Sequence, residues 1–297
     1  MLFASIDIGS NAVRLLFANV FENRNRASAD KASLIRIPIR LGLDVFNEGR
    51  ISDEKADNLV KTMQAFRLLL EVYQPLAYTA CGTAAMREAS NSEEILARVF
   101  NETGIKVRII DGQEEAGIIS ALNSISINRQ FGTTMYVDVG GGSTEISVMA
   151  GERFINSASF NIGTLRLLCG KVEQSEWDKM EEWLVPFQLK SGQINVVGSG
   201  GNINKLTKLY GSTINNTVTL KELEYAFDHL GKMNMQERIE TMGLRPDRAD
   251  VIVPASDIFV RILKWAHQDY VIAPKIGLAD GLVLQLFNEY TMTEKVV

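Results

Sequence analysis

The sequence contains few of the residues that form disulfides or bind zinc. Two cysteines, Cys81 and Cys169, cannot build a disulfide framework. No metal-ligand spacing surrounds the two histidines, His229 and His267, so we interpret both as structural. No apolar run reaches the length of a membrane span, and the first ten residues, MLFASIDIGS, lack the basic segment of a signal peptide. These absences predict a cytoplasmic protein that does not bind a membrane.

The charge and the length of the chain narrow the class of protein further. With 31 basic and 36 acidic residues the net charge is −5, which predicts no nucleic-acid partner because such binding needs a broad basic face. A locally basic cleft is still sufficient for a small polyanion. A chain of 297 residues exceeds one typical core and predicts two domains. We place the domains at residues 1–125 and 126–297. The second domain is expected to contain a helical insertion. The last helix of the chain is a candidate to pack on the first domain.

A glycine-rich stretch, MYVDVGGGSTEISVM, occupies residues 135–149. Two β-rich runs flank the three glycines at 140–142, which can adopt positive φ, so the stretch predicts a tight β-hairpin. If the hairpin is symmetric, Asp138 and Glu145 stand directly opposite each other on one face. Two such carboxylates repel unless a cation lies between them, which predicts a divalent metal beside backbone N–H groups that bind phosphate oxygens. The alternative is an ordinary glycine hairpin with two solvated acids.

The first residues of the chain repeat this arrangement. Residues 3–20, FASIDIGSNAVRLLFANV, place Asp7 on an apolar strand before the small-residue turn 9–11, and Arg14 after it. Asp7 and Arg14 have the same spacing as Asp138 and Glu145. The repeat of one supersecondary unit predicts two related domains that face each other across a cleft.

Four further segments are candidates for phosphate chemistry. Arg87 follows small residues at a strand end, from which a guanidinium can clamp an anion. Glu114 and Glu115 begin a helix, where acids are favoured by about 0.3 to 1 kcal/mol, and one of them is alternatively a general base for water. Residues 198–202, GSGGN, lie between a strand and a helix and can cradle a phosphate. Residues 161–164 lead into another helix, expected to begin near Leu165, where Thr164 is either a plain cap or part of an anion site.

The pattern also predicts local structure at several places. We expect residues 33–43 to form one strand, with Arg36 and Arg40 on one face, and Val251–Val253 to form another. The expected helix caps are Ser52, Ser92, Thr219 with Glu222, and Asn234 with Glu237.

Seven segments occur in a fixed order: IDIGSNAVRLL, GTAAMREASN, IIDGQEEAG, VDVGGGSTEIS, NIGTLRL, VGSGGNINKL and RADVIVPA. In this order they resemble the exopolyphosphatase and guanosine pentaphosphate phosphohydrolase family. The resemblance covers nearly the whole chain, and seven ordered motifs are far more specific than any one of them. It implies an α/β fold of two RNase H-like domains, as in the actin, sugar-kinase and Hsp70 superfamily, closing around phosphates and a divalent metal.

The resemblance implies roles for individual residues. Glu115 aligns with the catalytic base that activates water, which leaves Glu114 with the structural interpretation. Asp138 and Glu145 match the acids of the metal and phosphate site, and the expected ion is Mg²⁺. The implied phosphate-binding residues are Asp7, Gly9, Ser10, Asn11, Arg14, Arg87, Gly140, Gly141, Gly142, Ser143, Gly198, Gly200 and Gly201.

The chain departs from the family pattern at three places. Ala84 stands where the family commonly has serine, which removes a hydroxyl contact to phosphate. Ala279, in GLADG, stands where the family has the arginine of a GLREG-like pattern. The chain ends at Val297 without the helical region that longer members use to grip extended polyphosphate, so we expect short chains as substrates.

Together, these expectations predict an enzyme that hydrolyses the terminal phosphoanhydride of polyphosphate and releases orthophosphate. The same site would serve 5′-phosphate removal from guanosine pentaphosphate, because the sequence does not show whether guanine fits. A non-catalytic sensor of guanosine tetra- or pentaphosphate is disfavoured by the retention of Glu115, Asp138 and Glu145. An ATP-dependent kinase is disfavoured because no acceptor or adenosine pocket is evident beyond residues 198–202. Frequency alone predicts a homodimer.

Overall fold

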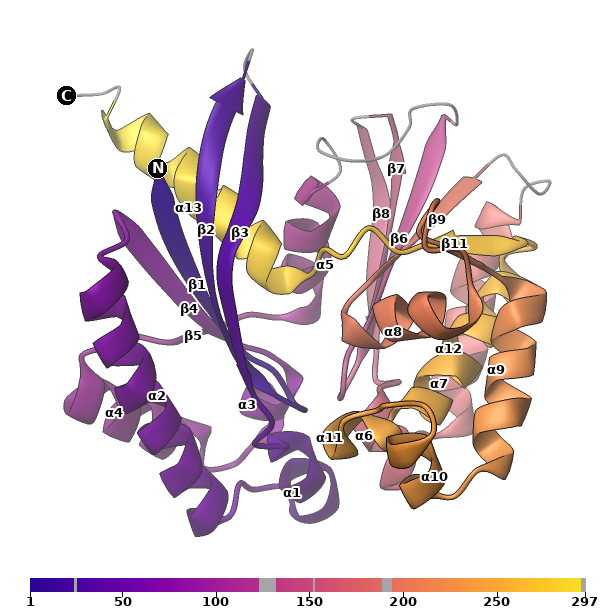
Figure 1. Ribbon diagram of the computed structural model, residues 1–297, viewed down its shortest axis with the longest axis horizontal. Coiled ribbons are helices and arrows are strands. Elements are labelled where there is room, and N and C mark those ends of the chain that lie inside the picture. The colour runs from indigo at the N-terminus through magenta and orange to yellow at the C-terminus, as the bar shows by residue number, and fades with distance from the viewer. Residues whose placement is uncertain (24–25, 123–131, 152, 189–193, 295–297) are drawn as a thin grey trace. The chain divides into compact units, whose positions relative to one another are not determined.

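The computed structural model of the chain contains two compact units (Figure 1). The first comprises Met1–Ile125 and Leu278–Val297, and the second comprises Ser126–Gly277. The structure describes residues 1–23, 26–122, 132–151, 153–188 and 194–294. Within these ranges no helix combines the length and the apolar character that a membrane crossing requires.

The first unit is built on a five-stranded sheet of order β3-β2-β1-β4-β5. Its strands are β1 (Leu2–Ile8), β2 (Val13–Asn23), β3 (Arg26–Ile37), β4 (Ala77–Gly82) and β5 (Arg108–Ile109). The first three strands are antiparallel, and β4 and β5 continue the sheet in parallel. Its helices are α1 (Leu41–Glu48), α2 (Asp53–Tyr73), α3 (Ala84–Glu88), α4 (Ser92–Thr103), α5 (Gly112–Ala121) and α13 (Leu278–Glu294).

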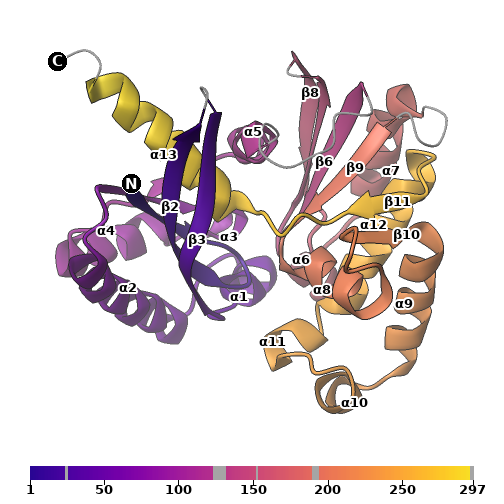
Figure 2. The ribbon, with the colours of Figure 1, turned by 45° about the horizontal axis from the view of Figure 1, so that its top comes forward.

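Side chains of β1 and β2 alternate between the two faces of this sheet, and a different helix packs on each face. Ala4 is the register partner of Phe17, so Phe3 points to the face opposite Phe17. The ring of Phe3 lies 5.7 Å from that of Phe287 on α13, whereas Phe17 stacks on Tyr73 of α2 at 4.1 Å. The last helix therefore completes the core of the first unit on one face, and α2 covers the other (Figure 2).

The second unit is built on a six-stranded sheet of order β10-β11-β9-β6-β7-β8. Its strands are β6 (Thr133–Val139), β7 (Thr144–Ala150), β8 (Arg153–Phe160), β9 (Ile194–Ser199), β10 (Thr217–Thr219) and β11 (Tyr270–Ile272). Its helices are α6 (Thr164–Leu168), α7 (Gln174–Leu184), η2 (Val185–Phe187), α8 (Gly201–Tyr210), α9 (Leu220–Lys232), α10 (Met235–Glu240), α11 (Pro246–Ala249) and α12 (Ile252–Trp265).

The two sheets share one topology. Taken from β8, the order β8-β7-β6-β9-β11 corresponds strand for strand to β3-β2-β1-β4-β5, and β10 is an addition at the edge. In both, three antiparallel strands are followed by two parallel ones. This is the arrangement expected of RNase H-like domains, so the predicted fold class is confirmed.

The predicted helix caps are largely confirmed. The Ser52 side chain accepts a hydrogen bond from Lys55 N at 3.4 Å, and Thr219 and Asn234 each form a full capping box. Ser92, however, is the first residue of α4 and the preceding Asn91 occupies the N-cap position. Because these signals depend on residues only three apart, they can be recognised in the sequence alone.

Two predicted strands are wrong. The run 33–43 is not one strand, because β3 ends at Ile37 and Arg40 has a left-handed conformation (φ 61°) before α1. Pro38 follows Ile37 directly and cannot donate a ladder hydrogen bond. Val251–Val253 belongs to the start of α12, where a short buried apolar run has the same composition in a helix as in a strand.

Gly281 lies where α13 packs closely on α5. A Cβ atom at Gly281 would lie 2.5 Å from Ile118 Cγ2 and 2.7 Å from Ile118 O. We expect Gly281→Ala to lower the free energy of unfolding by about 1 to 3 kcal/mol, because the two helix backbones must separate. Chemical denaturation measures this change.

The control for this substitution is Gly231→Ala in α9, where nothing lies within 4 Å of the added carbon. It should be neutral or stabilise the protein by up to about 1 kcal/mol, since alanine is the better helix former. Equal effects of the two substitutions would contradict the close packing at Gly281.

Candidate functional site

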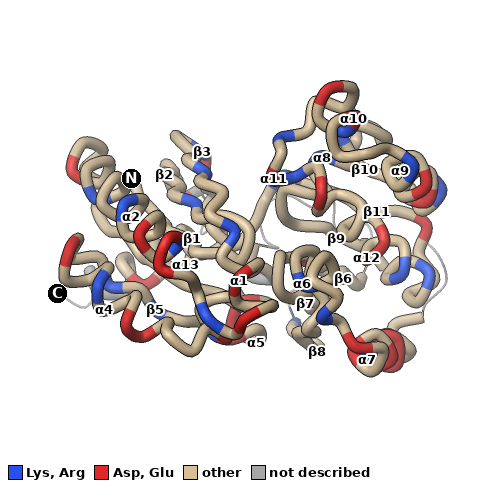
Figure 3. Tube along the Cα trace, turned by 90° about the horizontal axis from the view of Figure 1, so that it is seen from below, with Lys and Arg blue, Asp and Glu red and all other residues tan. Residues whose placement is uncertain are grey.

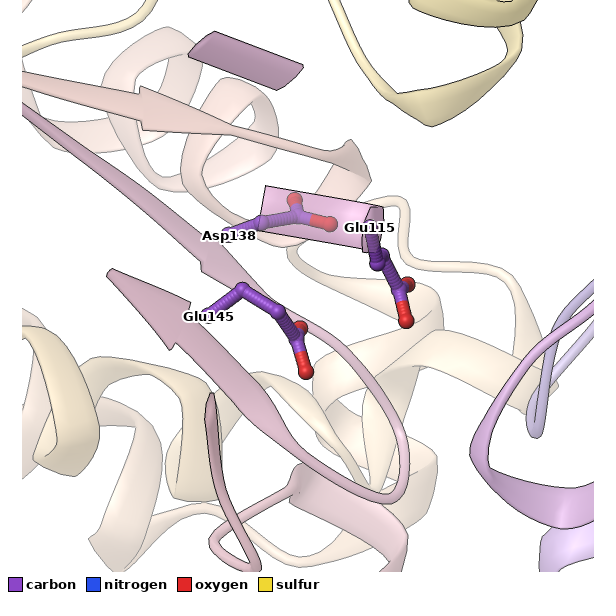
Figure 4. Close-up of side chains that lie close together, drawn as sticks. All are labelled: Glu115, Asp138 and Glu145. Atoms are coloured by element: carbon purple, nitrogen blue, oxygen red, sulfur yellow. The ribbon is translucent and has the colours of Figure 1, made fainter. Parts of the chain in front are cut away.

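The β6–β7 hairpin carries the acidic pair of the second unit. Asp138 and Glu145 are register partners, as predicted, and Figure 4 shows their side chains extending the same way from neighbouring strands. Each offers a carboxylate oxygen, and the two oxygens lie within 4.8 Å of each other. Val137 and Val139 on either side of Asp138 are buried, so alternation along β6 directs Asp138 to the opposite face.

Two serines from the flanking strands complete a row of polar side chains across four strands. Ser199 of β9 is the register partner of Asp138 and donates to its Oδ1. Ser159 of β8 is the partner of Glu145 and donates to its Oε1 at 2.8 Å. Ser199 lies in the predicted segment 198–202, but the contact of either serine with an acid was not predicted, because strand pairing across the sheet cannot be read from the sequence.

The chemistry of the acidic pair fits a divalent metal. Carboxylate oxygens are the ligands that Mg²⁺ prefers, and a hydroxyl group orients each carboxylate. Glu145 is only 2% exposed. Two neighbouring carboxylates, one of them buried, are costly to ionise together unless a cation compensates their charge.

The glycine turn between the strands is closely approached by Gly163 at the start of α6. Gly140 N donates to Ser143 O at 2.9 Å and closes the turn. None of the glycines at 140–142 is among the described residues with positive φ, so that predicted reason is wrong. A Cβ atom at Gly163 would lie 2.4 Å from Gly142 C. The start of α6 therefore packs directly on the turn.

Both predicted roles of Thr164 are wrong, each for its own reason. Gly163 is the N-cap residue of α6, and Thr164 makes no side-chain cap. The N–H groups of Thr164 and Leu165 donate to the carbonyls of the glycine turn at 3.0 and 2.8 Å. These groups are consequently engaged within the protein.

The second glycine loop connects β9 to α8. Gly200 has a φ of 90°, which favours glycine, and a Cβ atom there would lie 3.2 Å from Asp138 Oδ1. A Cβ atom at Gly201 would lie 2.7 Å from a guanidinium nitrogen of Arg248 on α11. Gly198 lies within β9 instead, where a Cβ atom would contact Val271 at 2.8 Å.

Arg248 was not predicted as a site residue. It lies in the segment RADVIVPA, but its spacing from the glycine loop gives no sign of their contact. Figure 3 marks such basic positions in blue on α11 and also on α6, which carries Arg166. Arg166 is only 9% exposed, and its Nε donates to Gly142 O at 2.7 Å. Only the folded second unit reveals both arginines as neighbours of the glycine loops.

The first unit contains the corresponding hairpin. Asp7 and Arg14 are register partners and form an ion pair. Asp7 is 2% exposed, and its Oδ1 accepts no hydrogen bond from the described residues. Gly9 N donates to Ala12 O at 3.1 Å, which matches the closure of the second unit's turn. The predicted repeat thus extends to the hydrogen bonding of the turn.

The two adjacent glutamates of α5 have different surroundings. Glu114 forms an ion pair with Arg108, and its side chain is 36% exposed. Glu115, also drawn in Figure 4, is 6% exposed, and its Oε2 lies 3.8 Å from Arg87 Nη1. The same Arg87 nitrogen donates to Ile110 O at 2.7 Å, which fixes the guanidinium.

Cys81 shows that Asp7 and Glu115 belong to one region of the first unit. Cys81 is the register partner of Asp7 on β4. Burial raises the pKa of the Cys81 thiol well above its usual value, and the negative charges of Asp7 and Glu115 raise it further. Asp7, Arg87 and Glu115 therefore form a charged group at the ends of β1, β4 and β5.

The residues of the unusual GLADG segment anchor α13 to the first unit. Ser5 Oγ donates to Ala279 O at 2.7 Å, and Lys31 Nζ donates to Asp280 at 2.9 Å. Ala84, the other departure from the family pattern, is a buried residue at the start of α3.

Comparison with known sequences identifies related proteins. The model of the Ppx/GppA phosphatase family matches residues 33–289. Exopolyphosphatase 1 of Mycobacterium tuberculosis is 26% identical in an alignment of 329 positions, which covers 96% of this chain and 91% of that protein. A bifunctional 3-dehydroquinate synthase/phosphatase of Fusobacterium nucleatum is 26% identical over 324 residues, and this chain spans 46% of its length.

Solved structures show the same fold. The Ppx/GppA family member of Aquifex aeolicus has a TM-score of 0.74 and 27% identity, over 97% of this chain and 98% of that chain. An exopolyphosphatase from Cytophaga hutchinsonii has a TM-score of 0.81 over 97% of this chain and 98% of that chain, at 21% identity. The family match covers most of the sequence. The chain therefore belongs to the Ppx/GppA phosphatase family.

Proposed function

We propose that this protein hydrolyses the terminal phosphoanhydride bond of inorganic polyphosphate and releases orthophosphate. The observation that carries the proposal is the position of Glu115, a buried carboxylate beside the fixed guanidinium of Arg87. A buried carboxylate is suited to a general base, and a fixed arginine to a terminal phosphate. The relatives named exopolyphosphatase support polyphosphate as the substrate.

The proposed reaction is an in-line displacement at phosphorus. Arg87 holds the terminal phosphoryl group, and Glu115 orients a water molecule and accepts its proton. The water oxygen forms a bond to the terminal phosphorus while the bridging P–O bond breaks. The electron pair of that bond leaves with the shortened polyphosphate, and the terminal group departs as orthophosphate.

The remaining site residues bind the charged substrate in this proposal. In the first unit, Arg14 and the turn at residues 9–11 contact phosphate oxygens. In the second unit, the N–H groups of Gly141, Gly142 and Ser143 do so, and the loop at Gly200 and Gly201, with Arg248 beside it, contributes further contacts. Asp138 and Glu145 would hold Mg²⁺, which when bound neutralises charge on the non-bridging oxygens.

Measurements of orthophosphate release, nucleotide binding and ATP dependence distinguish the proposal from three other activities. Orthophosphate release is measured side by side from short polyphosphate, long polyphosphate and guanosine pentaphosphate. Release from the nucleotide alone would replace the proposal with guanosine pentaphosphate hydrolysis. Tight nucleotide binding without release would indicate a sensor, and turnover that depends on ATP would indicate a kinase.

We expect Glu115→Gln to lower kcat for polyphosphate by about 10²- to 10⁴-fold, because an amide cannot accept the proton of water. The dissociation constant for polyphosphate should change little, since the phosphate-binding groups are retained. Orthophosphate release gives kcat, and calorimetric titration with the substrate gives the dissociation constant.

Glu114→Gln is the matched control for this experiment. It removes the same charge from the neighbouring residue, which forms an exposed ion pair worth at most about 1 kcal/mol. Its activity should stay near that of the unmodified protein. Turnover by Glu115→Gln at a near-normal rate would refute the assignment of the base.

Removal of divalent metal with EDTA should abolish orthophosphate release, and Mg²⁺ should restore it.

Asp138→Asn and Glu145→Gln should each weaken Mg²⁺ binding by about 10-fold or more, because a neutral amide replaces a charged ligand. Calorimetric titration with Mg²⁺ alone measures this without substrate. Asp228→Asn, on the exposed face of α9, is the control and should bind Mg²⁺ normally. Unchanged Mg²⁺ affinity in both site variants would remove the acidic pair from the metal site.

A further inference from the structure

Three consecutive carbonyls of the β6–β7 turn accept hydrogen bonds from the start of α6. The bonds run from Thr164 N to Gly140 O (3.0 Å), from Leu165 N to Gly141 O (2.8 Å) and from Arg166 Nε to Gly142 O (2.7 Å). Arg166 N also donates to Gly141 O at 3.1 Å. The third carbonyl thus differs from the first two, because its donor is a side chain.

These bonds fix the direction in which the turn presents its N–H groups. The described chain contains no cis peptide bond, and a trans peptide directs its C=O and N–H to opposite sides. The N–H groups of Gly141, Gly142 and Ser143 therefore point away from α6. Successive N–H groups that point the same way form a concave anion-binding site.

The first unit also holds the carbonyls of its turn by hydrogen bonds from a helix start. Ser10 O and Asn11 O of its turn accept hydrogen bonds from Gly42 N (2.9 Å) and Arg40 N (3.2 Å), at the start of α1. In both units the helix that follows the third strand binds the carbonyls of the turn. The first unit does so with backbone donors, whereas the second unit uses the guanidinium of Arg166 for Gly142.

The glycines make this restraint necessary. Glycine has a wide choice of φ and ψ, so the ψ angle of Gly142, which orients the Gly142–Ser143 peptide, can change with little steric cost. A rotated Gly142–Ser143 peptide would direct its carbonyl oxygen, a partial negative charge, toward a bound phosphate. The buried Arg166 side chain opposes this rotation because it binds Gly142 O.

We infer that Arg166 is a positioning residue, which holds the Gly142–Ser143 peptide with its N–H group directed at a phosphate oxygen of the substrate. The inference rests on the proposed function only for the identity of the anion. Arg166 acts in this inference through the Gly142 carbonyl that its Nε binds. Its effect is to keep a donor, and not an acceptor, in the phosphate site.

The test uses Arg166→Met, which retains the length of the side chain and removes its donors. We expect kcat/KM for polyphosphate to fall by roughly 10²-fold, the usual cost of losing one donor to a developing oxyanion. Arg166→Lys keeps a charged donor and should recover most of the loss. Arg153→Met, at an exposed position of β8, is the control and should leave kcat/KM unchanged.

A second readout does not depend on turnover. The amide resonances of Gly142 and Ser143 in ¹⁵N-labelled protein should shift when tripolyphosphate is added, and the Ser143 shift should be lost in Arg166→Met. A protein that releases no orthophosphate would refute the proposed function, yet these shifts would still test the inference. A purely structural role would instead lower the melting temperature and leave the Ser143 response intact.

Two results would overturn the inference. One is an Arg166→Met variant that folds and retains both the kcat/KM and the Ser143 shift of the unmodified protein. The other is the absence of any Gly142 or Ser143 response to tripolyphosphate in the unmodified protein. The second result remains measurable even if Arg166→Met does not fold.

Discussion

The structure of the second unit depends on one electrostatic constraint, the placement of two carboxylates opposite each other on paired antiparallel strands. Asp138 and Glu145 are fixed in register by a short turn, so neither can move away from the other. The first unit has the same hairpin but carries Asp7 and Arg14 at the corresponding positions, which form an ion pair. One repeat thus pairs its carboxylate with an arginine on the facing strand, while the other places two carboxylates opposite each other, an arrangement that could bind a metal ion.

The turns of the two hairpins are held by a shared principle. Carbonyls of each turn accept hydrogen bonds from the start of a helix, α1 in the first unit and α6 in the second. The N-terminal N–H groups of a helix lack partners within the helix, and here they bind the turn. The close approach at Gly163 leaves no room for a side chain. Packing between a helix and a turn, and not the turn sequence alone, therefore fixes the direction of the peptide groups in each turn.

The adjacent glutamates of α5 illustrate how surroundings give identical side chains different chemistry. Glu114 and Glu115 both gain from the helix dipole, so that effect does not distinguish them. Glu114 points to solvent and pairs with Arg108, whereas Glu115 is buried near Arg87. Burial, which the helix pattern did not resolve, therefore distinguishes the two side chains.

The sequence by itself determined what depends on near neighbours. The pairing of Asp138 with Glu145, the capping boxes at Thr219 and Asn234, and the duplicated hairpin all follow from spacings of a few residues. The tertiary structure alone decided which distant segments meet. It placed Ser159 and Ser199 beside the acids, and Arg166 and Arg248 against the glycine loops. Strand order and helix packing are set by the burial of the whole core, so no local pattern encodes these contacts.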